Sequence, residues 1–184
     1  MSEISGPSHE QGIQIVSICP TCAGLKEPGS EHSHIAPGDI IFNDKSTAAF
    51  VAPLSYREGG THVIVAPVEH YASILDVPRI VNAKVAETAQ RVAKMILDAC
   101  GMKRVTIIYD SKPVDDLPEH YQWAVYPRSA NDRYEPSADR EPTYPVDQAV
   151  RAGFAAKLRA AEEAAKVPPP NILERRLKNP AEHN

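Results

Sequence analysis

Cys19 and Cys22 form a C-x-x-C pair near the N-terminus, and this spacing points most directly to chemistry. In a reducing compartment, such a pair fits a metal site, a redox pair or two unrelated buried thiols. Zinc prefers tetrahedral sulfur and nitrogen ligands, so a zinc site here needs two further ligands. His32 and His34 are the nearest histidines downstream, although solvated loop histidines are the simpler interpretation of both.

The segments between the polar residues predict an α+β domain. Short runs rich in apolar and β-branched residues predict strands at 39–43, 48–52, 61–66, 104–109 and about 120–126. A long helix is predicted from about Pro78 to Cys100, with Asp76 at its N-cap and Gly101 ending it. Its apolar residues recur at three- and four-residue steps and form one stripe that can pack on a sheet: Val81, Val85, Ala89, Val92 and Ile96.

Length and composition favour one domain with a C-terminal extension. The 184 residues divide into a loose N-terminus at 1–12, a main domain at 13–130 and an extension at 131–184. In the extension, residues 146–166 are alanine-rich and predict a helix, on which Phe154 and Leu158 could dock on the main domain. Pro168 to Pro170 ends that helix.

The charge pattern excludes several kinds of partner. A net charge of −4 without a basic stripe argues against nucleic acid, and no apolar run is long enough for a membrane span. The first twelve residues lack the basic start and apolar core of a secretory signal, so we expect the cytoplasm.

Two further motifs resemble the histidine triad family. Residues 60–70, GTHVIVAPVEH, resemble the family strand in which glycine and histidine precede apolar residues and Pro-x-x-His. Residues 120–128, HYQWAVYPR, resemble its closing strand, where three alternating histidines precede apolar residues and Pro-Arg. With the cysteine pair, the resemblance spans about residues 15–130. It implies an antiparallel sheet with one long helix packed on it, and a homodimer.

The resemblance also implies a zinc site. Zinc-bearing members of the family use two N-terminal cysteines, the histidine of Pro-x-x-His and the first triad histidine. Those positions are Cys19, Cys22, His70 and His120. A closed set of two cysteines and two histidines is typical of a structural site.

The family's nucleophile is missing from the same strand. In the family, the middle triad histidine attacks the α-phosphate of a nucleotide. Here the middle position is Gln122 and the last is Ala124, and a carboxamide cannot attack phosphorus. Because side chains alternate along a strand, we expect His120, Gln122 and Ala124 on one face and Tyr121 and Trp123 in the core.

The phosphate and ribose positions implied by the resemblance have changed as well. Asp116 and Leu117 replace an amide and a hydroxyl that usually bind phosphate, Asp110 replaces an asparagine, and Ala52 replaces the acid that holds the ribose. Carboxylates beside a phosphate repel it by about 1 kcal/mol in water and by more in a cleft. This pattern predicts a changed or abandoned nucleotide function.

The remaining polar residues leave three functional hypotheses. A cleft could be lined by His62, Asp110, Asp115, Asp116, Gln122, Tyr109 and Arg128, with His62, Asp110 and Gln122 as candidate catalytic residues and Asp116, Arg128 and Tyr109 as ligand-binding residues. A histidine near carboxylates can perform acid–base chemistry, whereas solvated loop charges and a backbone-bonded His62 are the alternative interpretation. The favoured hypothesis is a protein that binds or acts on a small ligand lacking phosphate. A catalytically inactive interaction scaffold and a nucleotidyl hydrolase or transferase with another nucleophile are the alternatives.

Overall fold

The computed structural model describes residues 18–109, 119–129 and 144–166 and confirms the α+β class. The helices are α1 (Pro20–Lys26), α2 (Arg79–Cys100) and α3 (Gln148–Lys166), with a 3-10 turn, η1, at Pro37–Asp39. The strands are β1 (Ile40–Asn43), β2 (Thr47–Val51), β3 (Leu54–Ser55), β4 (Val63–Pro67), β5 (Arg104–Tyr109), β6 (Trp123–Arg128) and β7 (Tyr144–Pro145).

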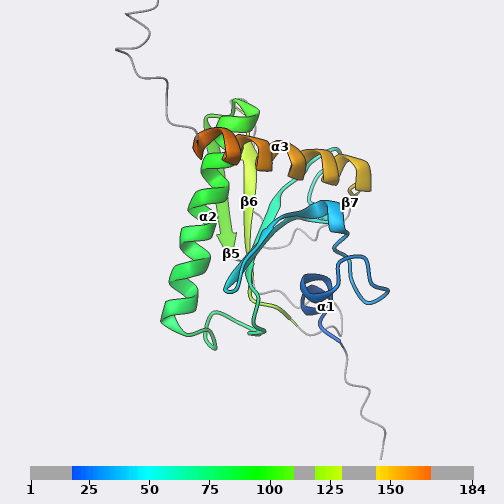
Figure 1. The fold of residues 1–184 in the computed structure, drawn as a ribbon, viewed down its shortest axis with the longest axis vertical. Helices are drawn as coiled ribbons and strands as arrows, with labels where there is room; N and C mark the ends of the chain where they lie inside the picture. Colours follow the sequence, from blue (N-terminus) through cyan, green and yellow to red (C-terminus); the bar gives the residue numbers. More distant parts are fainter. Residues whose placement is uncertain (1–17, 110–118, 130–143, 167–184) are drawn as a thin grey trace, which may run out of the picture.

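Five strands form one antiparallel sheet in the order β1-β2-β4-β6-β5 (Figure 1). The last strand of this sheet in the sequence, β6, lies between β4 and β5, with Val63 opposite Val125 and Thr106 opposite Tyr126. This order brings the end of β4 next to the start of β6. Histidines predicted on two separate segments are therefore placed side by side.

Helix α2 covers one face of the sheet with the predicted apolar stripe. Val85, Ala89, Val92 and Ile96 are all fully buried, which confirms the periodicity of the helix. Gly101 ends the helix in the left-handed region at φ 63°, where glycine carries no steric penalty.

The predicted N-cap of α2 is wrong. Pro78 occupies the N-cap with an extended backbone and makes no side-chain hydrogen bond, because the proline ring has no polar side-chain atom. The Asp76 carboxylate instead accepts a hydrogen bond from the Ser73 hydroxyl, at 2.8 Å, within the preceding turn.

The opposite face of the sheet is partly covered by α1, a helix that the sequence patterns did not predict. Leu25 of α1 and Ile35 pack with a second apolar group from β2 and β4, which includes Phe50, Ile64 and Ala66. Gly24 permits this close packing, because a Cβ at that position would lie 2.9 Å from Ile35.

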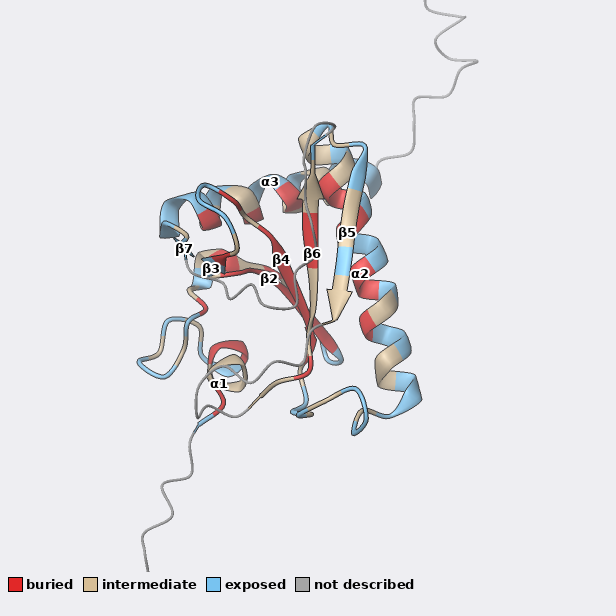
Figure 2. Cartoon of the chain, turned by 180° about the vertical axis from the view of Figure 1, so that it is seen from behind, coloured by how far each residue is buried: buried red, intermediate tan, exposed pale blue. Residues whose placement is uncertain are grey.

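Helix α3 contacts α2, η1, β1 and β2 (Figures 1 and 2). Leu158 is fully buried and Phe154 packs against the same core as α2, as their spacing predicted. The sequence division at residue 130 thus separates segments that share one core.

Tyr144 of β7 also returns to the main body, where it pairs with Ser55. Among the described residues, no helix is long and apolar enough to cross a membrane.

Candidate functional site

Four potential metal ligands from three separate segments meet at one edge of the molecule. Cys19 is the N-cap of α1 and Cys22 lies in its first turn; His70 follows β4 and His120 precedes β6. Their ligand atoms all lie within 4.8 Å of one another. The cluster that the resemblance implied is therefore assembled by the fold.

The distances within the cluster fit a tetrahedral metal. The Nδ1 atom of His120 lies 3.5 Å from the Sγ atoms of both Cys19 and Cys22, and Nδ1 of His70 lies 3.4 Å from Sγ of Cys22. A tetrahedral zinc with bonds of about 2.3 Å to sulfur and about 2.0 Å to nitrogen separates sulfur from nitrogen by about 3.5 Å. The donor set and its spacing thus fit one zinc ion.

A hydrogen bond orients the His120 ring for this role. Its Nε2 lies 3.0 Å from the carbonyl oxygen of Pro67, so Nε2 carries the proton and donates it to that oxygen. Burial lowers the pKa of His120, so the ring is neutral at pH 7 and Nδ1 presents a lone pair to the thiols. The sequence identified Pro67 only as part of the Pro-x-x-His motif; the role of its carbonyl was not predicted, because a backbone acceptor has no side-chain signature.

The thiol of Cys22 needs a cation to lose its proton at neutral pH. Burial, and then the neighbouring Cys19, raise the pKa of Cys22 to about 11. Metal binding at this site must therefore release a proton, and metal affinity must rise with pH.

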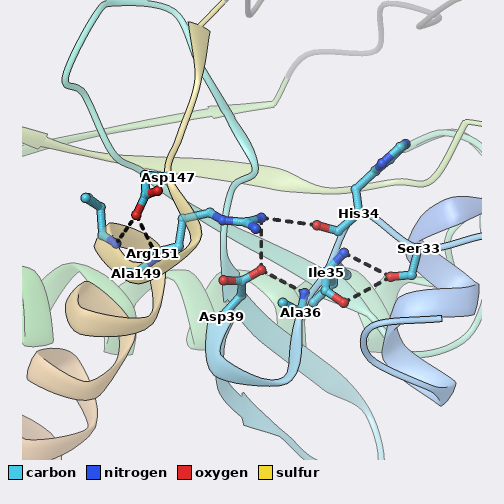
Figure 3. A network of polar contacts seen from close by, with 9 residues as sticks. Ser33, His34, Ile35, Ala36, Asp39, Asp147, Ala149 and Arg151 are labelled. Carbon is cyan, nitrogen blue, oxygen red and sulfur yellow. Dashed lines mark hydrogen bonds and ion pairs between the residues drawn. The ribbon is translucent and has the colours of Figure 1, made fainter. Parts of the chain in front are cut away.

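The rival ligands near the cysteines lie elsewhere. His32 is exposed and pairs with Glu31 at 3.2 Å, and His34 is also exposed (Figure 3). Among the described residues, neither belongs to the group that could hold a metal ion. The solvated-loop interpretation of both histidines fits these positions.

The strand after His120 alternates as predicted, although it starts later. Pairing in β6 begins at Trp123 rather than at His120, so His120 and Gln122 lie just ahead of the strand. Tyr121 is 1% exposed in the core beneath α2, and its hydroxyl accepts a hydrogen bond from Trp123 Nε1 at 2.6 Å. Ala124 packs on the opposite face with the second apolar group.

His62 lies on that opposite face, stacked on an aromatic ring. Its imidazole is 4.5 Å from the ring of Tyr126 at an interplanar angle of 23°, and Tyr56 lies 5.9 Å away. The side chain is buried, and among the residues that the structure describes its Nδ1 has no hydrogen-bond partner. Burial lowers the pKa of His62 to about 3, so the imidazole is neutral at every physiological pH.

The structure places Tyr109 and Arg128, two of the predicted ligand-binding residues, on opposite faces of the sheet. Tyr109 pairs with Trp123 on the α2 face, where its hydroxyl accepts a hydrogen bond from the backbone N–H of Ile74 at 3.0 Å. Arg128 lies on the His62 face, where its guanidinium donates to the hydroxyl of Thr106 at 2.9 Å. Tyr109 thus cannot line a site with Arg128 and His62.

Several predicted site residues lie outside the described part of the chain. They are Asp110, Asp115, Asp116 and Leu117, from the segment between β5 and β6. Ala52, at the position of the ribose-binding acid, is buried at 3% exposure, and its N–H donates to the carbonyl of His62 at 3.0 Å. That position therefore offers no carboxylate to a ribose.

The fold is that of the histidine triad proteins. A zinc-bound histidine triad family protein from Mycobacterium smegmatis superposes with a TM-score of 0.59 at 24% identity, covering 80% of this chain and 97% of that one. A hypothetical histidine triad nucleotide-binding protein from Sulfolobus tokodaii gives 0.62 at 17% identity, covering 80% and 94%. A histidine-triad-like protein from Bartonella henselae, described as involved in cell-cycle regulation, gives 0.55 at 19% identity, covering 67% and 85%.

At these identities the similarity establishes the fold. No family model matches the sequence, and neither does any curated protein. The expected antiparallel sheet with one long helix is therefore confirmed by structure.

Proposed function

We propose that this chain is a zinc-stabilised protein of the histidine triad fold that has no histidine nucleophile and binds a small ligand lacking phosphate. The orientation of His120 carries the proposal. Its Nδ1 faces two thiols and its Nε2 faces the carbonyl of Pro67, so neither nitrogen is available for attack. The next two positions on that face are Gln122 and Ala124, which have no nucleophilic nitrogen.

His62 does not replace the missing nucleophile. Its side chain is 4% exposed beside Tyr126, so a phosphorus atom cannot reach it in line without displacing the surrounding rings. Its very low pKa also prevents it from acting as a general acid at neutral pH. The neutral ring is suited to a hydrogen bond with an uncharged group.

The chemistry of this face favours a neutral ligand over a nucleotide. Gln122 contributes a half-buried carboxamide, and Tyr56 and Tyr126 contribute aromatic surface beside His62. In the sequence, the segment between β5 and β6 contains Asp110, Asp115 and Asp116, and carboxylates beside a phosphate would repel it. We propose Gln122 as the described residue that contacts the ligand, with His62 in the aromatic layer beneath this face and Asp110 and Asp116 as further candidates from the sequence.

Ligand identification and nucleotide titration test this proposal together. Mass spectrometry of gently purified, zinc-loaded protein should reveal a bound small molecule without phosphorus. Calorimetric titration of the same preparation with AMP or GMP should show no saturable heat. Saturable binding of either nucleotide to the zinc-loaded protein would overturn the ligand class, whereas the zinc content would remain a separate result.

We also propose that two copies associate through β5 and the start of α2. Strand β5 lies at the edge of the sheet, and apolar residues around it are exposed (Figure 2): Ile107 at 39%, Ile80 at 69% and Leu75 at 91%. The hydrogen bond between Tyr109 and Ile74 places the loop before α2, which includes Leu75, at the end of β5. An unpaired edge with apolar neighbours is suited to antiparallel pairing with a second copy.

Light scattering of edge variants tests the dimer. The chain of 20.1 kDa should behave as a particle of twice that mass, and Ile107→Lys should shift it to the monomer. Val150→Lys is the control, because Val150 is exposed on α3, away from β5. Dimers that persist with Ile107→Lys would contradict the proposed interface.

We also propose that the protein works in a reducing compartment, where Cys19, Cys22 and Cys100 remain thiols.

A further inference from the structure

The proposed zinc centre is open to solvent on one side. Cys22 is half-buried and His70 is exposed, whereas Cys19 is 8% exposed. A small solute can therefore reach the sulfur of Cys22 while Cys19 remains shielded behind it. Exposure of a sulfur ligand is the condition under which oxidants attack it.

The two sulfurs are also placed to bond to each other. Cys19 caps α1 and Cys22 lies three residues later in its first turn, and the N–H of Cys22 points at Sγ of Cys19 at 3.5 Å. Residues three apart in a helix have Cα atoms about 5 Å apart. That separation falls within the range of about 4.4–6.8 Å found for disulfides. The backbone thus needs no rearrangement to accept a disulfide.

We propose that Cys19 and Cys22 form a reversible thiol switch, in which a peroxide converts the pair to a disulfide and the metal is released. The inference rests on the proposed zinc centre. Cys22 Sγ attacks one peroxide oxygen, breaks the O–O bond and becomes a sulfenic acid, and the other oxygen takes a proton and leaves as water. Cys19 Sγ then attacks the sulfenic sulfur, forms the S–S bond and displaces the second water after another proton is taken up. Two electrons pass from the sulfurs to the peroxide.

The disulfide removes half of the ligand set and changes the neighbourhood of Gln122. His70 and His120 cannot hold the ion tightly by themselves, because two neutral imidazoles leave two positions unfilled. α1 stays attached, since Leu25 is buried and its carbonyl accepts a hydrogen bond from Asn43 at 3.1 Å. The loosened parts are the segments that carry His70 and His120. Oxidation would thereby also affect Gln122 of the ligand-binding face, which lies two residues after His120 in the sequence.

Cys100 allows a clean experiment, because it is the last residue of α2 and does not belong to the ligand group. Full-length Cys100→Ser protein is purified with its zinc and titrated with hydrogen peroxide. Released zinc is followed with a chromogenic chelator and the disulfide by mass spectrometry under non-reducing conditions. We expect one equivalent of zinc to be released per disulfide formed, with both reversed by dithiothreitol and added zinc. Fluorescence of Trp123, the single tryptophan, should change with the same midpoint.

The possible outcomes distinguish a failure of the proposed switch from a failure of the proposed zinc centre. Cys100→Ser protein that contains no zinc before oxidation would overturn the zinc centre and the switch with it. Zinc present at first but retained after peroxide treatment would overturn the switch alone. Zinc released with the sulfurs oxidised to sulfinic acids, and not recovered by dithiothreitol, would also overturn the switch.

Discussion

The carboxylate of Asp39 and the guanidinium of Arg151 form a buried ion pair, with 2.9 Å between Oδ2 and Nη1 (Figure 3). The same Oδ2 accepts the N–H of Ala36 at 2.8 Å, and Arg151 also donates to the carbonyl of His34 at 3.2 Å. Burial raises the pKa of Asp39, whereas the Ala36 N–H and Arg151 lower it. The pair thus joins α3 to the turn that precedes β1.

Removing one partner of this ion pair should destabilise the whole domain. Arg151→Ala leaves the fully buried Asp39 carboxylate without its counter-charge, which typically costs about 3–5 kcal/mol. Urea denaturation should show that loss in the free energy of unfolding, whereas Lys157→Ala, on the exposed side of α3, should change it by less than about 0.5 kcal/mol. A loss below about 1 kcal/mol for Arg151→Ala would show that α3 is not held by this pair.

Removing one metal ligand should cost both zinc and thermal stability. His120→Ala should abolish stoichiometric zinc, because one of four ligands is lost. Ligand binding at 100 to 1,000 times Kd stabilises by about 3–4 kcal/mol, so the melting temperature should fall by about 10 °C. His34→Ala is the matched control, since His34 is exposed outside the cluster. Plasma mass spectrometry measures the zinc content and calorimetry measures the melting temperature. Zinc retained by His120→Ala would refute the assigned site.

Buried His62 should make the protein sensitive to acid. Its folded pKa of about 3 lies below the unfolded value of about 6.5, so the unfolded chain binds more protons between these values. This contribution to stability is therefore complete above pH 6.5 and is lost as the pH falls towards 3. At pH 4.5 the loss amounts to about 2–3 kcal/mol.

His62→Phe isolates this contribution, because phenylalanine keeps a ring against Tyr126 and does not titrate. The drop in unfolding free energy between pH 7.5 and 4.5 should be smaller in His62→Phe by about 2–3 kcal/mol. Zinc loss at low pH affects both proteins and cancels in the difference. Equal drops in the two proteins would mean that His62 is solvated or already paired.

Restoring one histidine should not restore nucleotide chemistry. Gln122→His supplies an imidazole, but Ala124 provides no neighbouring imidazole and buried Ala52 cannot hold a ribose. Loss of a single preorganised donor costs about a hundredfold or more in rate, so several losses should leave the variant near background. Hydrolysis of dinucleoside polyphosphates and nucleoside phosphoramidates measures this. Robust turnover by Gln122→His or by the wild type would mean that the pocket positions are misassigned.

The sequence alone predicted the elements whose patterns are local. The stripe of α2 follows from its period, whereas the four ligands were implied by the resemblance to the histidine triad family. Helix α1 was missed because its seven residues include proline, threonine and glycine and are fixed by the burial of Leu25 and the cap at Cys19. That stabilisation is tertiary, so propensity carries little of its signal.

Two features could not be predicted, each for its own reason: the residue at which β6 starts, and the face of the sheet on which Tyr109 lies. Pro67, which lies opposite the region before Trp123, has no N–H for a ladder bond, and its carbonyl binds the His120 ring instead. In β5, Val105, Ile107 and Ile108 put apolar side chains on both faces of the strand. The pattern of apolar and polar residues therefore does not indicate which face lies on the core. Only the pairing register with β6 shows that Tyr109 faces α2.

The position of β6 between β4 and β5 bears on how the chain is made. While the ribosome has released only the residues up to the end of α2, the outer edge of β4 has no partner and the metal ligands lack His120. The nascent chain must therefore keep an open strand edge until residues 123–128 emerge, and its core stays incomplete until Leu158 of α3 arrives. Until these segments have emerged, the open edge of β4 is exposed to association with other chains.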